Sequence, residues 1–451
     1  MSDYRETIDA PLVLVPQYFG STVFDRSKSR YYPFDAETTD VLRRTQNEPI
    51  EAILAEIQDP SKREQLLNFF FHFYDMDFFT GDHYFKGKCL DVQPADNHLT
   101  GPMAVHLEVI AACNLTCTHC FAGELPRHGG DRLTLKEIER VFEDMAKMGS
   151  YRLGLTGGEP LLRKDIFDII DMATDYGLHP CLTTNALLIT EDIAREFGKR
   201  DLVWLNVSLE GATAMTNDPV RGQGTFNQVM EKLNILKNHA RFTMAFTIMS
   251  TNADEVVACA ELAHQVGAST AVFRPLYPVG TAGKFLSDLM PTFEQYNTAL
   301  NLLAELEIES DEADMNTIDP FSPYSRQDTQ AVTYDNHGCG AGNLVCSISV
   351  SGDVNPCSFL GSGFVADNVR QRPLSEIWHK SAKFNEIRTY SGGTDETFSG
   401  GCRARSLVFN GSANAPDPWL DEQQTLVNAP RQSNVTFYDP LDIVRVSTRG
   451  D

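Results

Sequence analysis

Three cysteines, Cys113, Cys117 and Cys120, stand close together in the segment AACNLTCTHCFAG with the spacing C-x3-C-x2-C. Thiolates are the usual ligands of iron–sulfur clusters, and a [4Fe–4S] cube is normally held by four cysteines. A set of three leaves one iron open to an outside ligand, much as catalytic zinc sites keep one open position. The spacing therefore predicts an iron–sulfur site with chemistry at the open iron. A zinc site is the alternative, but His119 is too close to Cys120 to chelate easily beside it.

Four more cysteines gather near the C-terminus, in the segments HGCGAGNLVCSISVSGDVNPCSFL and FSGGCRARS. They are Cys339, Cys346, Cys357 and Cys402. The stretch ISVSGDVNPC predicts a two-stranded hairpin that turns at residues 351–353, with Cys346 and Cys357 near its ends. Clustered thiols in a long chain predict a second metal centre rather than disulfides. Zinc is again the alternative to an iron–sulfur cluster, although the C-x2-C pairs typical of zinc modules are absent.

Between the two cysteine groups the hydrophobic pattern alternates between strands and amphipathic helices. Strands are expected at 104–110, 151–156, 179–184, 203–209, 242–248 and 270–275. The clearest helix runs from Thr134 to Met148, with a capping box of Thr134 and Glu137 and a closing Gly149. Six βα units in succession predict an α/β fold, a partial (β/α)6 TIM barrel with its helices outside. Chemistry in such folds lies at the carboxyl ends of the strands, and Cys113 follows the first of them.

These features resemble the radical SAM superfamily. The cysteine motif follows the first strand, and the segment TGGEP at 156–160 follows the second, as the methionine-binding segment of that family does. The resemblance implies that the three cysteines hold a [4Fe–4S] cluster and that S-adenosylmethionine (SAM) binds the open iron. It further implies that one electron from the reduced cluster cleaves SAM to a 5′-deoxyadenosyl radical, which abstracts a hydrogen from the substrate.

The same resemblance implies which residues contact SAM: Gly157, Gly158, Glu159, Asn185, Ser208, Glu210 and Arg221. In the family the GGE segment holds the SAM amino group, and residues at the end of strand four face the ribose and the carboxylate. The family more often has Asp at the position of Glu210. Asn185, Ser208 and Arg221 can equally be ordinary strand-end or helix-cap residues. Topology alone places Arg274 and Tyr277 near a substrate cavity, and the sequence assigns no catalytic acid or base.

The second cysteine group resembles the SPASM extension of radical SAM peptide maturases, in its Gly-x-Val-x-Pro-Cys hairpin and its GGCRA element. The resemblance implies that its four cysteines hold an auxiliary [4Fe–4S] cluster. Full SPASM domains hold a second auxiliary cluster through a C-x2-C-x5-C run and a final cysteine after a DP dipeptide. This chain has TYSGGTDETFSGGC and DPWL instead, which predicts one auxiliary cluster. The remaining Cys89, Cys181 and Cys259 are expected to be buried small apolar residues.

Residues 1–100 predict a small α+β unit, with strands in PLVLVPQYFG, STVFDR and RYYPFD and helices after them. The segment FGSTVFDRSKSRYYPFDAETTDVL resembles the winged-helix-like PqqD element. That element grips the leader of a ribosomal precursor peptide by adding it to the sheet as an extra strand. A scaffold domain without a peptide role is the alternative. The aromatic run from Phe69 to Phe79 is expected to be packed core rather than a binding surface.

The expected organisation of the 451 residues is therefore a recognition domain at 1–100, a partial barrel at 101–300, an acidic helical linker at 301–335, a SPASM-like domain at 336–420 and a tail at 421–451. The segment 294–316 predicts the helix that leads into the linker. An excess of 62 acidic over 38 basic residues, a net charge of −24, argues against nucleic acid as a partner. No apolar run reaches the roughly 18 residues of a membrane helix, and no secretory signal is visible. A soluble, cytoplasmic protein is expected.

Taken together, these patterns predict a radical SAM maturase that modifies a ribosomally made peptide by crosslinking, backbone excision or a related rearrangement. The nearest subclass is that of nif11-type precursors. Expected partners are the precursor peptide, an electron donor such as ferredoxin or flavodoxin, and a small accessory recognition protein. The alternative substrate is a small molecule such as a tetrapyrrole, a sugar or a redox-cofactor precursor, because GGCRAR followed by NAPDP also resembles tetrapyrrole side-chain enzymes. A third hypothesis is a non-enzymatic iron–sulfur assembly protein, but the GGE segment argues against it.

Overall fold

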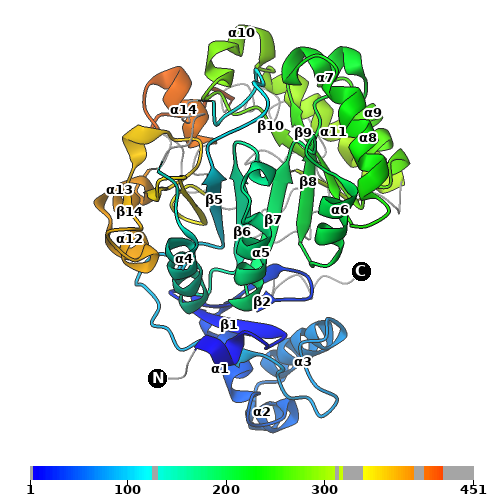
Figure 1. The fold of residues 1–451 in the computed structure, drawn as a ribbon. Coiled ribbons are helices and arrows are strands. Elements are labelled where there is room, and N and C mark those ends of the chain that lie inside the picture. The colour runs from blue at the N-terminus through cyan, green and yellow to red at the C-terminus, as the bar shows by residue number, and fades with distance from the viewer. Residues whose placement is uncertain (1–3, 124–130, 310–313, 318–338, 391–400, 420–451) are drawn as a thin grey trace.

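The centre of the molecule is a sheet of parallel strands wrapped by helices (Figure 1). The computed structural model describes residues 4–123, 131–309, 314–317, 339–390 and 401–419. Six parallel strands form the partial barrel: β5 (Ala104–Ile110), β6 (Arg152–Gly157), β7 (His179–Thr184), β8 (Trp204–Ser208), β9 (Thr243–Ile248) and β10 (Thr270–Pro275). The helices between and after them are α4 (Leu135–Lys147), α5 (Ile166–Asp175), α6 (Glu191–Gly198), α7 (Ala214–Arg221), α8 (Thr225–Leu236), α9 (Val256–Gln265) and α11 (Phe293–Glu309). All six predicted strands are confirmed.

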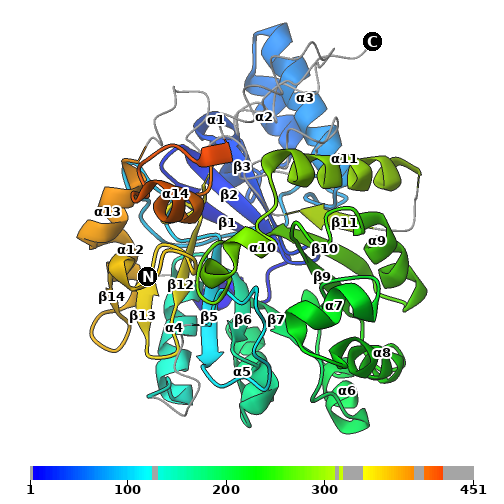
Figure 2. The same ribbon diagram turned by 90° about the horizontal axis from the view of Figure 1, so that it is seen from above.

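Alternation along the strands separates a helix-facing side from a barrel interior. On β5, Val105, Leu107 and Val109 are buried in the main hydrophobic core with residues of α4. The intervening His106 and Glu108 therefore face the interior, because side chains alternate along a strand. The predicted capping box of α4 is present, with the Thr134 side chain accepting from the Glu137 backbone. The view from above shows the strands inside and the helices around them (Figure 2).

At its β10 edge the sheet contains one strand more than the sequence predicts. There β11 (Asp314–Thr317) runs parallel to β10, in register from Thr270 opposite Asp314. The expectation of a helix over 294–316 is wrong in its last part, because α11 ends at Glu309. Pairing supplies hydrogen-bond partners to an otherwise open strand edge, which explains why the chain is extended there. Most of the predicted linker, 318–335, and the predicted tail, 421–451, lie outside the described residues.

At the other edge the C-terminal cysteine segment joins the barrel sheet. The strand β12 (Val345–Ile348) pairs in parallel with β5, and β13 (Asp353–Asn355) and β14 (Asp367–Asn368) continue the sheet in antiparallel fashion. The predicted hairpin is thus confirmed, and it adds directly to the strand that precedes Cys113. The helices α12 (Leu374–Lys380), α13 (Ala382–Arg388) and α14 (Arg403–Asn410) pack on this side of the molecule (Figure 1).

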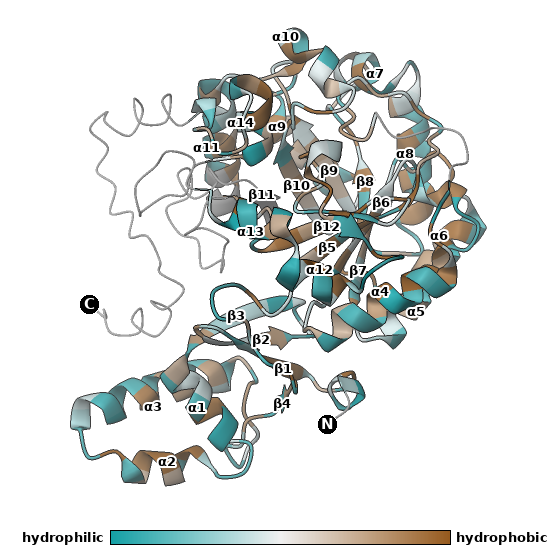
Figure 3. Ribbon diagram, turned by 90° about the vertical axis from the view of Figure 1, so that its left-hand side faces the viewer, coloured by the Kyte–Doolittle hydropathy of each residue, from teal (hydrophilic) through white to brown (hydrophobic). Residues whose placement is uncertain are grey.

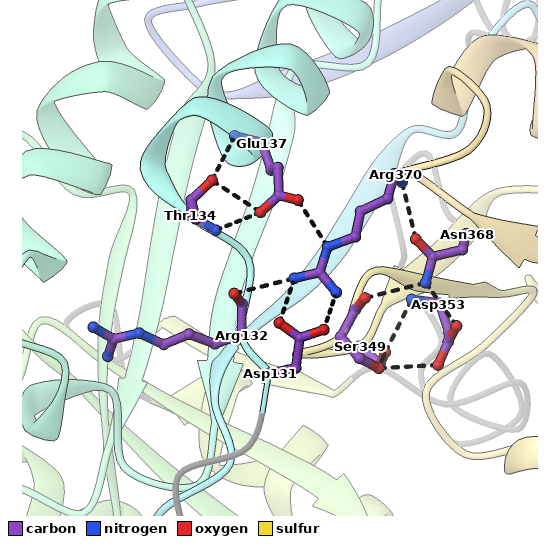
Figure 4. Close-up of polar contacts among 9 residues, drawn as sticks. Asp131, Arg132, Thr134, Glu137, Ser349, Asp353, Asn368 and Arg370 are labelled. Carbon is purple, nitrogen blue, oxygen red and sulfur yellow. Dashed lines mark hydrogen bonds and ion pairs between the residues drawn. The ribbon is translucent and has the colours of Figure 1, made fainter.

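An arginine holds this segment against the start of α4. Arg370, which follows β14, donates to Glu137 at 2.8 Å and to Asp131 at 2.6 Å (Figure 4). Hydrogen bonds from Thr134, together with Arg370, lower the pKa of Glu137 to about 2. A few residues later the Ser375 backbone donates to Asp144 of α4 at 2.8 Å. The segment after β14 is therefore anchored by charge-assisted contacts to the first helix of the barrel.

The N-terminal domain is a sheet with three helices on one side. Its strands are β1 (Leu12–Gln17), β2 (Gly20–Asp25), β3 (Arg30–Asp35) and β4 (Lys88–Cys89), in the order β3-β2-β1-β4. Its helices are α1 (Ala36–Arg44), α2 (Ile50–Glu56) and α3 (Pro60–Asp75). Most of the aromatic run is buried core, as predicted, but Phe71 is 58% exposed and Tyr74 is 38% exposed. None of the helices in the described ranges is long and apolar enough to span a membrane.

This sheet covers the end of the barrel opposite to the cysteine loop (Figures 1 and 3). The Tyr31 hydroxyl donates to the Gly149 carbonyl at 3.0 Å and accepts from the Tyr151 backbone at 2.7 Å. The Arg26 guanidinium donates to the carbonyls of Thr7 and Gly177, so it joins the two units as well. The contact is both polar and aromatic, because the Phe24 ring packs on Tyr151 at 4.9 Å between centroids. The N-terminal domain is therefore held against the barrel by direct contacts.

Replacing Tyr31 with Phe should weaken this docking. The change leaves the buried Tyr151 N–H and the Gly149 carbonyl without their partner, which costs about 1–3 kcal/mol. Chemical denaturation should show an unfolding free energy lower by that amount. Tyr18→Phe, at a ring that is 48% exposed, is the matched control and should change little. Equal stability of Tyr31→Phe and the wild type would contradict the docking role.

Candidate functional site

The three cysteines of the first motif lie in one loop above the carboxyl ends of the strands. Cys113, Cys117 and Cys120 line a common cavity with Gly158. The loop is fixed from two sides, because the Thr118 backbone donates to the Val220 carbonyl and the Thr281 backbone donates to the Cys120 carbonyl, both at 2.9 Å. The structure therefore brings the three predicted thiols together at the predicted end of the barrel.

The two glycines after β6 allow the chain to approach this loop closely. The Gly158 backbone donates to Ile110 at 2.7 Å, and the Glu159 backbone donates to Ala112 at 2.8 Å. A Cβ atom at Gly158 would collide with the Ala112 carbonyl, and Gly157 has a φ of 139°. Only glycine fits such an approach without displacing backbone. The GGE segment is thus built against the residues that lead into Cys113.

Glu159 and Asn185 connect the strand ends beneath the loop. The Glu159 carboxylate is 1% exposed and accepts from the Thr184 hydroxyl at 2.7 Å and from the Asn185 backbone at 2.8 Å. Burial raises the pKa of Glu159, and these donors oppose that rise. The Asn185 side chain donates to Asn114, next to Cys113, at 2.7 Å. Both residues therefore position the cysteine loop, and their predicted contact with SAM stays a prediction.

Glu210, after β8, lies at the centre of a buried polar network. Its carboxylate accepts from Arg221 at 2.9 Å and from the Thr247 backbone at 2.8 Å, and it pairs with His119 at 3.0 Å. Burial by itself would raise the pKa of Glu210, but His119 and Arg221 outweigh it and the pKa is lowered. Ser208 stands two residues earlier, half-buried at the end of β8. Glu210 and Arg221 therefore lie next to the cysteine loop, whereas Ser208 is placed only by its position at the end of β8.

His119 is the residue that the sequence did not assign to this network. Its Nε2 atom reaches Glu210, while its Nδ1 atom is buried without a hydrogen-bond partner in the described part of the chain. The Nε atom of Arg221 has no partner there either. No motif spacing could have linked His119 to Glu210, because 90 residues separate them. Their pairing follows only from the closure of the barrel.

The second cysteine group is brought together in part. Cys339, Cys357 and Cys402 share a small hydrophobic cluster. The pKa of Cys357 is raised mainly by burial and further by the neighbouring Cys339. Cys346 lies on β12 in the main core instead, and burial raises its pKa to about 12 against the nearby Arg388. The hairpin still places Cys346 on β12 and Cys357 two residues beyond its partner β13, since Ser347 is opposite Asn355.

The DP dipeptide near residue 417 supports Cys402. The Asp417 carboxylate accepts from the Cys402 backbone at 2.5 Å and from Arg405 at 2.7 Å, and both Arg405 and Asp417 are buried. The Trp419 ring covers the Arg405 guanidinium at 3.6 Å. At the point where full SPASM domains carry a further cysteine ligand, this chain therefore uses the dipeptide to fix a cysteine that it already has.

An aromatic contact joins the two cysteine loops. Phe359, two residues after Cys357, stacks on Tyr277 with 3.6 Å between ring centroids. Its ring also meets the edge of Phe121, next to Cys120, at 5.0 Å. Tyr277 follows β10 directly, so three separate parts of the chain converge on Phe359. These ring contacts consequently fix the position of the two loops relative to each other, and the barrel interior lies beneath them.

Comparison with known proteins identifies the class. Residues 107–275 match the radical SAM superfamily, and residues 339–404 match the SPASM iron–sulfur cluster-binding domain. Over 339 residues the chain is 30% identical to mycofactocin maturase MftC of Mycolicibacterium smegmatis, which covers 72% of this chain and 84% of that protein. The chain belongs to the radical SAM superfamily. The predicted enzyme class is therefore confirmed, with SAM, a [4Fe–4S] cluster and SPASM iron–sulfur chemistry as its cofactors.

Other radical SAM proteins are similar over comparable lengths. AdoMet-dependent heme synthase of Methanosarcina barkeri is 29% identical over 344 residues, 70% of this chain and 96% of that protein. The crystal structure of Streptococcus suis SuiB bound to precursor peptide SuiA matches with a TM-score of 0.69 at 15% identity, covering 91% of this chain and 98% of that one. At this identity the likeness concerns the fold, and it confirms the α/β architecture with a radical SAM core.

The donor set fits the cofactors of a radical SAM enzyme. Three thiols line one cavity, and burial raises the pKa of Cys117 to about 11 although Arg221 lies near it. Within the described ranges, no three His, Cys, Asp or Glu side chains are arranged to hold a single metal ion. A cube with iron at several corners needs its sulfur ligands further apart than one ion does. The Nε atom of Arg221, which has no partner in the described residues, can donate a hydrogen bond beside this loop to an anionic group such as a carboxylate.

The three cysteines outside the two groups differ from one another. Cys259 is buried in the core, as predicted. Cys89 is only half-buried and donates to Gln46, and Cys181 faces the barrel interior rather than the apolar core. The prediction of three buried small apolar cysteines is therefore confirmed for Cys259 and wrong for Cys89 and Cys181, which are only half-buried. The missing side chain of Gly154, the strand partner of Cys181, leaves space that the His106 ring occupies, 3.0 Å from where a Cβ atom would stand.

Glu108 is a buried acid on the interior face of β5. One of its carboxylate oxygens has no hydrogen-bond partner in the described residues, and the Val350 backbone donates to the side chain. Burial raises the pKa of Glu108 to about 7, and the Val350 hydrogen bond only partly opposes it. Glu108 lies in register with Thr156, just before the GGE segment. The sequence assigned it no role, because a lone glutamate in a strand carries no motif.

Glu108→Gln should change how stability depends on pH. Since the folded-state pKa is raised from 4.5 to about 7, folded protein keeps a proton that the unfolded chain loses, and stability falls as pH rises through that window. The Gln variant lacks this loss, so its advantage over wild type should grow to about 3 kcal/mol by pH 8. Denaturant unfolding at pH 5 and pH 8 measures it, with exposed Glu64→Gln as control. A difference independent of pH would contradict the assignment.

Iron analysis tests the predicted number of clusters. Two [4Fe–4S] clusters would give about eight iron atoms per reconstituted chain, and Cys113→Ala should lower this to about four. Cys259→Ala, in the apolar core, is the control and should leave the iron content unchanged. About twelve iron atoms per wild-type chain would contradict a single auxiliary cluster.

Proposed function

We propose that this radical SAM enzyme is a maturase that modifies a ribosomally synthesised precursor peptide. Three observations support the proposal: the similarity to a maturase over most of the chain, the fold shared with a protein crystallised with its precursor peptide, and the N-terminal sheet. The match to SuiB spans 91% of this chain, so it extends into the N-terminal domain. The reaction on the peptide is a crosslink, an excision or a related rearrangement.

The observation that carries the proposal is the position of β3 at the edge of the N-terminal sheet. In the described sheet β3 pairs only with β2, and although Tyr31, Tyr32 and Phe34 are themselves buried, its other edge is the place where a further strand would add. Pro33 in the middle of β3 is typical of an edge strand, because proline cannot complete a ladder. A peptide that adds to this edge gains main-chain hydrogen bonds largely independent of its side chains. We infer that the leader of the precursor binds here, while its core segment reaches the barrel.

In this function the side chains of the chain hold and place the reactants. When bound, the [4Fe–4S] cluster and SAM supply a 5′-deoxyadenosyl radical after transfer of one electron from a reductant such as ferredoxin or flavodoxin. Glu159, Asn185 and Glu210 fix the cysteine loop on the strand ends. The Phe359 contact holds the SPASM loop over the barrel interior, so that substrate lies between the two cysteine groups and away from water.

A second candidate substrate is a tetrapyrrole. The specific observation in its favour is the similarity to AdoMet-dependent heme synthase, whose length is covered to 96%. On this alternative the N-terminal sheet has a structural role at the end of the barrel, where Tyr31 and Arg26 donate hydrogen bonds to barrel carbonyls. The two candidates differ in whether the β3 edge binds a peptide.

Leader binding by strand addition gives a direct test. Synthetic precursor peptides encoded beside the gene should bind the full-length protein with micromolar or tighter affinity. N-methylation of alternate leader amides should weaken binding about tenfold or more, because each methyl removes a main-chain donor from the ladder. Methylation at the intervening amides, which point away from the protein, is the matched control. Binding of no neighbouring peptide, or equal affinity of both methylated sets, would contradict the proposal.

A further inference from the structure

Within the described residues, one half-buried arginine, Arg274, faces the barrel interior without a carboxylate partner. On β10, Ala271 and Phe273 pack into the core between the sheet and the helices. Because side chains alternate along a strand, Arg274 points to the opposite face, into the barrel. Its Nε atom is buried and makes no hydrogen bond within the described residues. A cationic side chain with an unused donor therefore lies inside the barrel.

Three buried arginines of the barrel and of the SPASM segment have carboxylate partners, whereas Arg403 donates to the backbone carbonyls of Tyr390 and Ala413. Arg163 pairs with Asp165 at 2.8 Å, and Arg221 pairs with Glu210 at 2.9 Å. The two buried residues 405 and 417 pair in the same way at 2.7 Å. Arg274 has no such partner in the part of the chain that the structure describes. It departs from the rule that a desolvated charge is paired.

The groups that face Arg274 cannot neutralise it. They are Tyr277, Cys181 and His106. Burial lowers the pKa of Arg274, and the tyrosine and the cysteine oppose this. Burial is the main cause that lowers the pKa of His106 to about 4, and the charges of Arg274 and Arg152 lower it further. The imidazole is therefore neutral at pH 7. Although the whole chain carries a net charge of −24, this part of the interior is positive.

Arg274 lies in the part of the barrel interior that the SPASM loop covers, where a substrate could bind beside it. The Ser358 hydroxyl lies 3.4 Å from His106, and Phe359 stacks on Tyr277. Both residues directly follow Cys357, so the SPASM loop forms the roof over this part of the barrel. A ligand on Arg274 would therefore lie beneath the contact that joins the two cysteine loops.

We propose that Arg274 binds a carboxylate of the substrate inside the barrel and selects substrates that carry one. A guanidinium presents a planar fork of N–H donors that matches a carboxylate, and the anion compensates the buried charge. The inference rests on the proposed function for the identity of the substrate as a peptide, where the group is an acidic side chain or the C-terminus. The propionates of a tetrapyrrole offer the same chemistry, so the test must separate the two sources.

Binding measurements on the reconstituted full-length enzyme test the assignment. The probes are the neighbouring precursor peptides, with each carboxylate in turn converted to an amide, and iron coproporphyrin III beside its tetramethyl ester. One amide, or the ester, should weaken binding to wild type about 10- to 100-fold, the usual range for a charge-assisted hydrogen bond. Arg274→Gln should bind the unmodified probe with the same loss and should no longer distinguish it from the modified one. Arg200→Gln, at a surface ion pair, is the matched control.

The outcomes separate the inference from the proposed function. Sensitivity to a peptide amide supports both, whereas sensitivity to the porphyrin ester alone supports the carboxylate site and overturns the peptide maturase. Peptide binding that neither amidation nor Arg274→Gln changes overturns the inference and leaves the maturase standing. Binding of neither probe overturns both. Arg274→Met without substrate should be at least as stable as wild type, because it removes an unpaired buried charge, and a clear loss of stability would make the residue structural instead.

Discussion

The site depends on one buried carboxylate, that of Glu210. It joins the cysteine loop through His119, α7 through Arg221 and β9 through the Thr247 backbone. The Asn252 side chain donates to the Glu210 carbonyl, which adds the loop between β9 and α9 to the same network. A buried carboxylate with a lowered pKa needs charges and donors around it, so the contacts of Glu210 tie these elements to one another. The position of the cysteine loop is therefore set by the barrel elements that Glu210 connects to it.

A second constraint comes from the edge of the barrel. The SPASM hairpin pairs with β5, the strand that leads into Cys113, so both cysteine groups share one sheet. The Phe359 ring then packs against residues next to Cys120 and after β10. On the opposite end, Tyr31 and Arg26 fix the N-terminal sheet to the barrel. The interior is therefore covered by this sheet at one end and by the SPASM loop at the other.

Local patterns were enough to predict the six strands, the capping box of α4, the SPASM hairpin and the first cysteine site, because each is encoded in a short segment. Features that depend on distant residues were not predictable. The pairing of His119 with Glu210, the free guanidinium of Arg274 and the raised pKa of Glu108 all arise from barrel closure. The strand β11 was mistaken for helix because an acidic amphipathic pattern preceded it, while tertiary pairing with β10 decided its conformation.

The central claim is that this radical SAM enzyme changes the covalent structure of a precursor peptide. Mass spectrometry of the neighbouring peptide, after incubation with the reduced, reconstituted enzyme and SAM, measures this directly. The account predicts 5′-deoxyadenosine together with a peptide of altered mass. A loss of two mass units would indicate crosslinking or oxidation, and loss of a residue-sized fragment would indicate excision. Formation of 5′-deoxyadenosine while every neighbouring peptide keeps its mass would contradict the claim.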